Sequence, residues 1–113
     1  AWAKYEMSCS TLDYREREMS GSSALSLAKI ELHYFLNNCF LKDNEILDNV
    51  KKIKNIPINI IQGRHDTICP PFTALKLRNK LTNSKLIMVE NAGHSAFETG
   101  IKNALIKSIS EIL

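Results

Sequence analysis

Hydrophobic and polar positions divide this chain into two stretches with different patterns. Before residue 52 the apolar residues recur at helical spacing, and a Ser-Gly-Ser-Ser sequence at 20–23 supplies a helix start signal. We therefore predict a helix over 22–36 and a shorter one over about 44–51, with Asp43 available as its N-cap and Ile46 facing inward. The apolar positions of the first helix are Leu25, Ala28, Leu32 and Phe35.

From residue 56 the pattern changes to short β-branched runs alternating with amphipathic segments. Residues 58–61 predict a strand, the prolines at 70–71 open a helix, and residues 85–89 predict a second strand. A last helix is expected from about Phe97, with apolar residues at spacings of four, four and three, namely Ile101, Leu105, Ile109 and Ile112. The order strand, helix, strand, helix predicts two parallel strands joined by a crossover.

An acid and a histidine follow these two strands. Asp66 comes shortly after the first strand and His94 shortly after the second, and glycines at 63 and 93 permit tight loops. Parallel strands deliver such residues to one edge of the sheet, so we expect the two side chains to meet there. The pair fits the acid and base of an α/β-hydrolase triad, whose chain order is Ser, Asp, His. The alternative is that Asp66 only caps a turn and His94 is a surface residue.

The third member of such a triad is missing from the sequence. No Gly-x-Ser-x-Gly occurs in the 113 residues, and the chain begins with Ala1 rather than Met. An α/β-hydrolase needs roughly 250 residues to build and cover its sheet. We therefore expect an α/β chain that is a C-terminal fragment of an α/β-hydrolase: two cap-type helices, then strand, helix, strand, helix. Such a fragment is expected to be inactive alone.

Composition adds few constraints. The net charge of +3 comes from 15 basic and 12 acidic residues spread along the chain, which favours neither nucleic acid nor an anionic membrane as a partner. No run of 18 apolar residues predicts a membrane span. The cysteines at 9, 39 and 69 lack CxxC spacing, so we expect free thiols of a reducing, cytoplasmic compartment, with no metal site.

Over essentially its whole length the sequence resembles the C-terminal part of the proline iminopeptidases, serine hydrolases of the α/β-hydrolase fold. Four segments carry this resemblance: Ala1-Trp2-Ala3-Lys4-Tyr5-Glu6, Ala28-Lys29-Ile30-Glu31-Leu32-His33-Tyr34-Phe35, Ile56-Pro57 through Gly63-Arg64-His65-Asp66, and Asn91-Ala92-Gly93-His94-Ser95. The second and third segments together are specific to this family, whereas the Asp and His loops alone would fit many α/β-hydrolases.

The resemblance implies a role for each part of the chain. Residues 1–52 match the rear of a helical cap, and 53–113 match the C-terminal part of the core. Asp66 and His94 match the triad acid and base, while Glu6 and Glu31 match acidic cap residues that grip the free α-amino group of the substrate. No cofactor is implied. The residues that match the apolar pocket for the prolyl ring are Phe35, Ile68 and Cys69.

Other readings of these residues stay open. In an esterase or epoxide hydrolase, Glu6 and Glu31 would be dispensable surface charges and blocked substrates would be accepted. Cys69 would then be a small packing residue. In a catalytically dead remnant, the chain would persist as a folded interaction module. The expected partners are a peptide with a free N-terminal proline and either the missing N-terminal half or a second copy bound through an exposed sheet edge.

Overall fold

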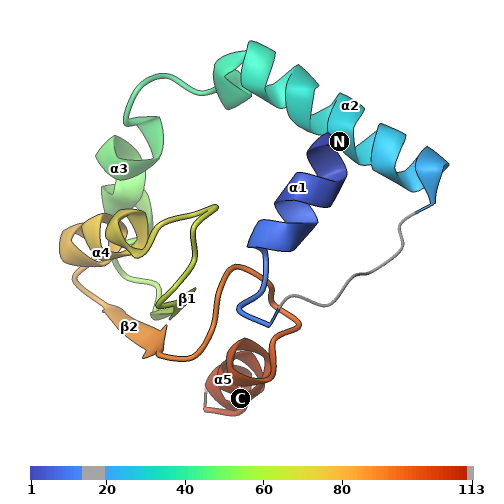
Figure 1. Ribbon diagram of the computed structural model, residues 1–113. Coiled ribbons are helices and arrows are strands. Elements are labelled where there is room, and N and C mark those ends of the chain that lie inside the picture. The colour runs from blue at the N-terminus through green and yellow to red at the C-terminus, as the bar shows by residue number, and fades with distance from the viewer. Residues whose placement is uncertain (14–19, 112–113) are drawn as a thin grey trace.

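The computed structural model describes residues 1–13 and 20–111 of the chain (Figure 1). The first half is helical and the second half alternates strands with helices, as the sequence pattern predicts. The elements in chain order are α1 (Trp2–Cys9), α2 (Gly21–Leu36), a 3-10 turn (Asn38–Phe40), α3 (Glu45–Asn49), a second 3-10 turn (Val50–Ile53), β1 (Ile58–Gly63), α4 (Pro71–Lys80), β2 (Ser84–Val89) and α5 (Thr99–Ser110).

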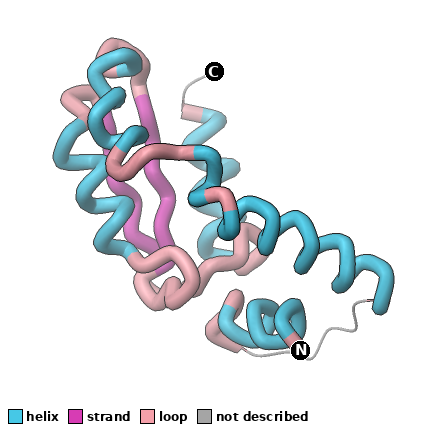
Figure 2. The backbone as a smooth tube through the Cα atoms, turned by 90° about the horizontal axis from the view of Figure 1, so that it is seen from above, coloured by secondary structure: helices cyan, strands magenta, loops and turns pink. Residues whose placement is uncertain are grey.

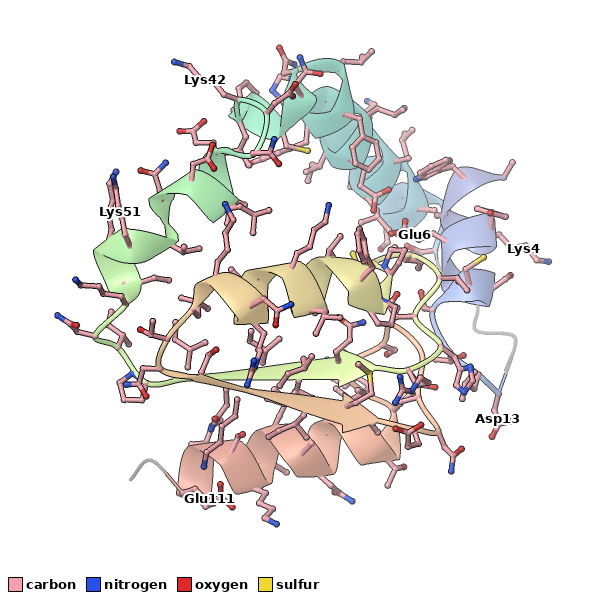
Figure 3. All side chains as sticks on the ribbon, turned by 90° about the vertical axis from the view of Figure 1, so that its left-hand side faces the viewer. Lys4, Glu6, Asp13, Lys42, Lys51 and Glu111 are labelled. Carbon is pink, nitrogen blue, oxygen red and sulfur yellow. The ribbon has the colours of Figure 1, made fainter. Side chains whose placement is uncertain are left out.

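The two strands form a parallel pair between two helices. Their register runs from Ile58 opposite Ser84 to Gly63 opposite Val89, which confirms the parallel arrangement expected from the crossover. Figure 3 shows α4 on one face of the pair and α5 on the other. The buried apolar residues of this layer are Ala74 and Leu81 with α4, and Ile101 in α5. This α/β arrangement is that of the C-terminal part of an α/β-hydrolase.

Helix α2 begins where the serine-rich signal predicts. Ser20 is its N-cap, and the Ser20 hydroxyl accepts a hydrogen bond from the Ser23 amide at 3.2 Å. Its apolar residues are not covered, however: Leu25 and Phe35 are both 56% exposed. Helix α2 packs mainly against α1 and the following turn, and none of its residues is buried (Figure 1).

Two helix starts differ from the expected positions. Helix α3 begins at Glu45, so its N-cap position is Asn44 rather than Asp43; Asn44 has a φ of 59°, and its side chain makes no capping hydrogen bond. Ile46, expected to face inward, is exposed. Helix α5 starts at Thr99 rather than near Phe97, because a turn closed by the Glu98 amide on the Ser95 carbonyl precedes it. Ile112, expected in this helix, lies outside the described residues.

Helices α1 and α2 lie near the carboxyl ends of the two strands. Both strand arrows point toward α1 in Figure 3, and the loops at that end lie beside α1 and α2 in Figure 2. Any residue projecting from those loops therefore faces the helical first half of the chain. Within the described part of the chain, no helix combines the length and apolar character needed to cross a membrane.

Candidate active site

The loops that leave β1 and β2 bring Asp66 and His94 together. They run side by side beyond the strands, where the Arg64 amide donates to the Val89 carbonyl at 2.9 Å and the His65 amide donates to the Ala92 carbonyl at 3.0 Å. His94 Nδ1 then lies 3.1 Å from Asp66 Oδ2. An ionised carboxylate only accepts hydrogen bonds, so this contact assigns the proton to Nδ1 and leaves Nε2 as the basic nitrogen.

Asp66 is buried and its carboxylate is held by several donors. Only 7% of the residue is exposed. Oδ1 accepts from the amides of Ile68 at 3.0 Å and Cys69 at 2.8 Å, and Oδ2 accepts from Gln62 Nε2 at 3.2 Å. These contacts fix the plane of the carboxylate, so that Oδ2 faces the imidazole. Asp66 therefore closes a turn and orients a histidine at the same time.

A glycine allows the two loops to approach this closely. A Cβ atom at Gly63 would lie 1.9 Å from the Gly93 carbonyl oxygen and 2.7 Å from that of Ala92. Both neighbours are backbone atoms and cannot swing aside, so every side chain is excluded at this position. The sequence suggested that Gly63 permits a tight turn. In the structure a glycine is needed there because the Asp66 loop and the His94 loop are in contact.

The His94 loop is also tied to the segment that follows α1. The Ser10 carbonyl accepts from the amides of His94 at 2.9 Å and Ser95 at 2.8 Å. The Glu98 carboxylate accepts from the Gly93 amide at 2.6 Å through Oε2 and from the Leu12 amide at 2.9 Å through Oε1. Four hydrogen bonds thus fix the loop that carries the histidine against the end of α1.

Sequence analysis did not identify Ser10 or Glu98. The contribution of Ser10 is a backbone carbonyl, which leaves no mark in the side-chain pattern. Glu98 precedes the last helix, where a carboxylate reads as an ordinary helix-start charge. Its position four residues after His94 was the available signal, because a side chain at that distance can reach back to the loop.

The two cap glutamates lie together beside the histidine. Burial raises the pKa of Glu6, the neighbouring Glu31 carboxylate raises it further, and His94 opposes the increase. Glu6 is therefore close to both Glu31 and His94. Its Oε2 atom is buried and has no hydrogen-bond partner among the described residues. Figure 3 shows Glu6 on the inner side of α1, with Lys4 on the outer side.

Glu31 is held by a residue of the other cap helix. The Trp2 indole Nε1 donates to Glu31 Oε2 at 2.6 Å, and the indole ring meets the Phe35 ring edge-on at 6.4 Å between centroids. Helices α1 and α2 therefore share a polar and an apolar contact. The sequence pattern did not mark Trp2 as a site residue.

The three residues expected to line the prolyl pocket have different surroundings. Burial raises the pKa of the Cys69 thiol, and the charges of Asp66 and Glu6 add to the effect, so the thiol lies near both carboxylates. Ile68 is half-buried in the Asp66 turn. Phe35 is mostly exposed and lies against Trp2. Ile68 thus joins this group through its amide bond to Asp66, whereas Phe35 reaches Glu31 by way of Trp2.

Acid and base at the ends of adjacent parallel strands, with helices over that edge, define the chain as part of an α/β-hydrolase. Comparison with family models matches residues 37–111 to the family described as TAP-like protein. The chain belongs to this family. In the described part of the chain no group of three or more His, Cys, Asp or Glu residues is arranged to hold a metal ion.

The similar proteins share the name proline iminopeptidase. The chain is 40% identical over 111 residues to the "Probable proline iminopeptidase" of Leptolyngbya boryana, 39% identical over 111 residues to the proline iminopeptidase of Arabidopsis thaliana, and 35% identical over 114 residues to that of Neisseria meningitidis serogroup B. These matches cover 94%, 94% and 100% of this chain but only 35%, 29% and 36% of the relatives. The chain therefore spans about a third of the length of these proteins.

Proposed function

We propose that this chain is the C-terminal portion of a serine aminopeptidase that releases N-terminal proline from peptides. The observation that carries the proposal is the position of Glu6 and Glu31 next to the Asp66–His94 pair. A general esterase has no need of paired carboxylates beside its histidine. An aminopeptidase must distinguish a protonated N-terminus from a blocked one, and charge-assisted hydrogen bonds to carboxylates do so.

In this proposal each residue has a distinct chemical role. Nε2 of His94 takes the proton from a serine hydroxyl as its oxygen attacks the prolyl carbonyl carbon. Asp66 stabilises the resulting imidazolium, which then protonates the leaving amine as the peptide C–N bond breaks. Water hydrolyses the prolyl ester by the same proton transfers. Glu6 and Glu31 bind the ammonium group, and Cys69, Ile68 and Phe35 line the side of the prolyl ring.

The serine is proposed to come from outside these residues. The 113 residues contain no Gly-x-Ser-x-Gly sequence, and the oxyanion donors of this fold include the amide after that serine. Removal of one oxyanion donor alone lowers the rate about 100- to 1,000-fold. The chain by itself is therefore proposed to be inactive, and purified chain with Asp66-dependent turnover would contradict this.

The remaining surface is proposed to bind the rest of such a protein. Within the described residues β1 and β2 pair only with each other, so each has an unpaired edge. Large apolar side chains, including Leu36, Phe72 and Phe97, are exposed around the strands and helices. An N-terminal portion or a second copy of the chain would cover them. The three free cysteines support a reducing, cytoplasmic location.

A chimera tests the proposed function. In it, this chain replaces the segment that it matches in the Neisseria meningitidis relative, and hydrolysis of proline p-nitroanilide is compared with hydrolysis of the N-acetylated substrate. We expect turnover of the free amine only. Asp66→Asn should lower kcat by about 10,000-fold, whereas Asp48→Asn, at an exposed ion pair with Lys80, should leave it unchanged.

Three other results would contradict the proposal. Equal turnover of free and blocked substrates, unaffected by Glu31→Gln, would indicate an esterase-type hydrolase. Turnover that does not depend on Asp66 would show that Asp66 is not the acid of a catalytic triad. A chimera with a cooperative thermal transition and no activity would indicate a remnant that serves only as a folded module.

A further inference from the structure

We propose that Trp2 is a positioning residue for Glu6 and Glu31, the proposed amine-binding pair. The indole N–H of Trp2 holds Glu31 against Glu6. The inference rests on the proposed function, because it concerns the same acidic pair. Its first support is the hydrogen bond of 2.6 Å between Trp2 Nε1 and Glu31 Oε2, which joins residues 29 positions apart on two helices. An indole N–H can only donate, and its bonds to carboxylates are among the stronger ones in proteins.

The indole ring is held in place by packing as well. It meets the Phe35 ring edge-on, with ring planes at 74° and centroids 6.4 Å apart. The centroid of the Tyr5 ring also lies 6.4 Å from that of the indole. Phe35 follows Glu31 by four residues, so both occupy one face of α2 a single turn apart. Trp2 therefore makes a polar and an apolar contact with the same stripe of α2, which restricts how α1 can rotate against it.

The same restriction places Glu6. Trp2 and Glu6 are also four residues apart, so α1 presents both on one face. With Trp2 fixed at Glu31 and Phe35, that face turns Glu6 toward Glu31. Loss of the indole N–H would therefore release the Glu31 side chain and loosen the pair.

The two carboxylates are left with different hydrogen-bonding needs. One Glu31 oxygen is occupied by the indole, whereas Glu6 Oε2 is buried and has no partner in the described parts of the chain. A protonated amine brings hydrogen-bond donors, and an unpartnered buried carboxylate oxygen is costly until it finds one. An incoming ammonium would thus bond to Glu6 and to the remaining oxygen of Glu31, while Trp2 keeps Glu31 in position.

The bond can be observed directly in the 113-residue chain. Trp2 is the sole tryptophan of the sequence, so the one indole N–H resonance in a proton–nitrogen NMR spectrum reports on this contact alone. We expect this resonance far downfield in the parent chain and shifted upfield in Glu31→Gln. Glu111→Gln, at the exposed end of α5, should leave it unmoved. An indole N–H chemical shift that is the same in the parent chain and in Glu31→Gln would overturn the proposal.

The role is tested in the chimera with proline p-nitroanilide. Trp2→Phe keeps a ring against Phe35 but removes the donor, and loss of one hydrogen bond to a charged group should raise KM about tenfold. We expect kcat to stay within about twofold, because the Asp66–His94 contact is unchanged. Tyr34→Phe is the matched control on α2, where the Tyr34 ring packs edge-on against Phe40 at 5.3 Å between centroids, and it should alter neither constant.

The outcomes separate this inference from the proposed function. An unchanged KM in Trp2→Phe, or a loss of kcat without a change in KM, would overturn the role of Trp2. If Glu31→Gln still raises KM in that case, the amine-binding pair stands without it. If no variant changes the preference for free over blocked substrate, the proposed function itself fails.

Discussion

At the residue scale, the largest departure from the sequence pattern is Glu98, which bonds two backbone amides that are far apart in the chain. Its carboxylate joins the Gly93 amide of the histidine loop to the Leu12 amide after α1. Few side chains could replace it, because two acceptor oxygens are needed at once. Glu98 therefore supports the position of His94 through the backbone of its loop.

Glu98→Gln should destabilise the chain. The amide keeps one acceptor and turns a donor toward the other amide, so a backbone N–H loses its partner at a cost of about 1–3 kcal/mol. The measurement is the free energy of unfolding in urea. Glu111→Gln is the control, because its ion pair with Lys107 is exposed and long at 4.0 Å, and such pairs contribute little. Equal stability of the two variants would mean that Glu98 does not hold the loop.

Glu6 gives a pH dependence whose sign follows from its environment. Burial and Glu31 raise its pKa in the folded state above the ordinary value of 4.5. Between the ordinary and the raised pKa the folded chain binds more protons than the unfolded chain, so stability falls as pH rises through this window. We expect Glu6→Gln to reduce this fall. The test is the free energy of unfolding of parent and variant, measured from pH 4 upward. A steeper fall in the variant than in the parent would contradict the prediction.

At the scale of elements, the contact between the Asp66 loop and the His94 loop depends on Gly63. Gly63 ends β1 and Gly93 follows β2 by four residues, and the structure shows that Gly63 has no room for a Cβ atom. Strand ends that lie side by side in register bring these loops together, because Gly63 pairs with Val89.

Gly63→Ala should therefore be poorly tolerated. The new methyl group meets two backbone carbonyl oxygens, and overpacking of this kind costs about 1–3 kcal/mol or more. The measurement is the thermal midpoint of the 113-residue chain. Gly21→Ala is the matched control, since no atom lies within 4 Å of a Cβ atom built there, and alanine favours a helix. A midpoint that falls equally in both variants would show that the loop contact is not the cause.

At the scale of the whole molecule, much apolar surface remains uncovered. The apolar positions of α2 and α3 recur at helical spacing, yet no residue of either helix is buried. A periodic apolar face is selected for packing, so the partner of these faces is proposed to lie outside the described residues.

The chain alone should self-associate. Its unpaired strand edges and exposed apolar side chains favour contacts between copies, and these contacts should weaken when an N-terminal portion of a relative is supplied. Sedimentation velocity over a range of concentrations measures this, with the chimera as control, whose sedimentation coefficient should not change with concentration. A chain that stays monomeric at all concentrations would contradict the prediction.

Local sequence pattern was enough to predict both strands, most of the helices and the pairing of Asp66 with His94. Helical periodicity, the Ser20 cap and the proline start of α4 act within a few residues, so local pattern was sufficient for them. The meeting of Asp66 and His94 followed from one general rule, that parallel strands deliver their following loops to a common edge.

The further residues that support the site became apparent from the packing of the helices and loops. Trp2 reaches Glu31 across 29 positions, and Glu98 reaches Leu12 across 86, because two helices and a loop pack at particular angles. Burial was also undetermined by the pattern, since Ile46 and Phe35 sit at helical spacing but stay exposed. Periodicity states which face is apolar, whereas the presence of a neighbour on that face depends on the packing of the whole molecule.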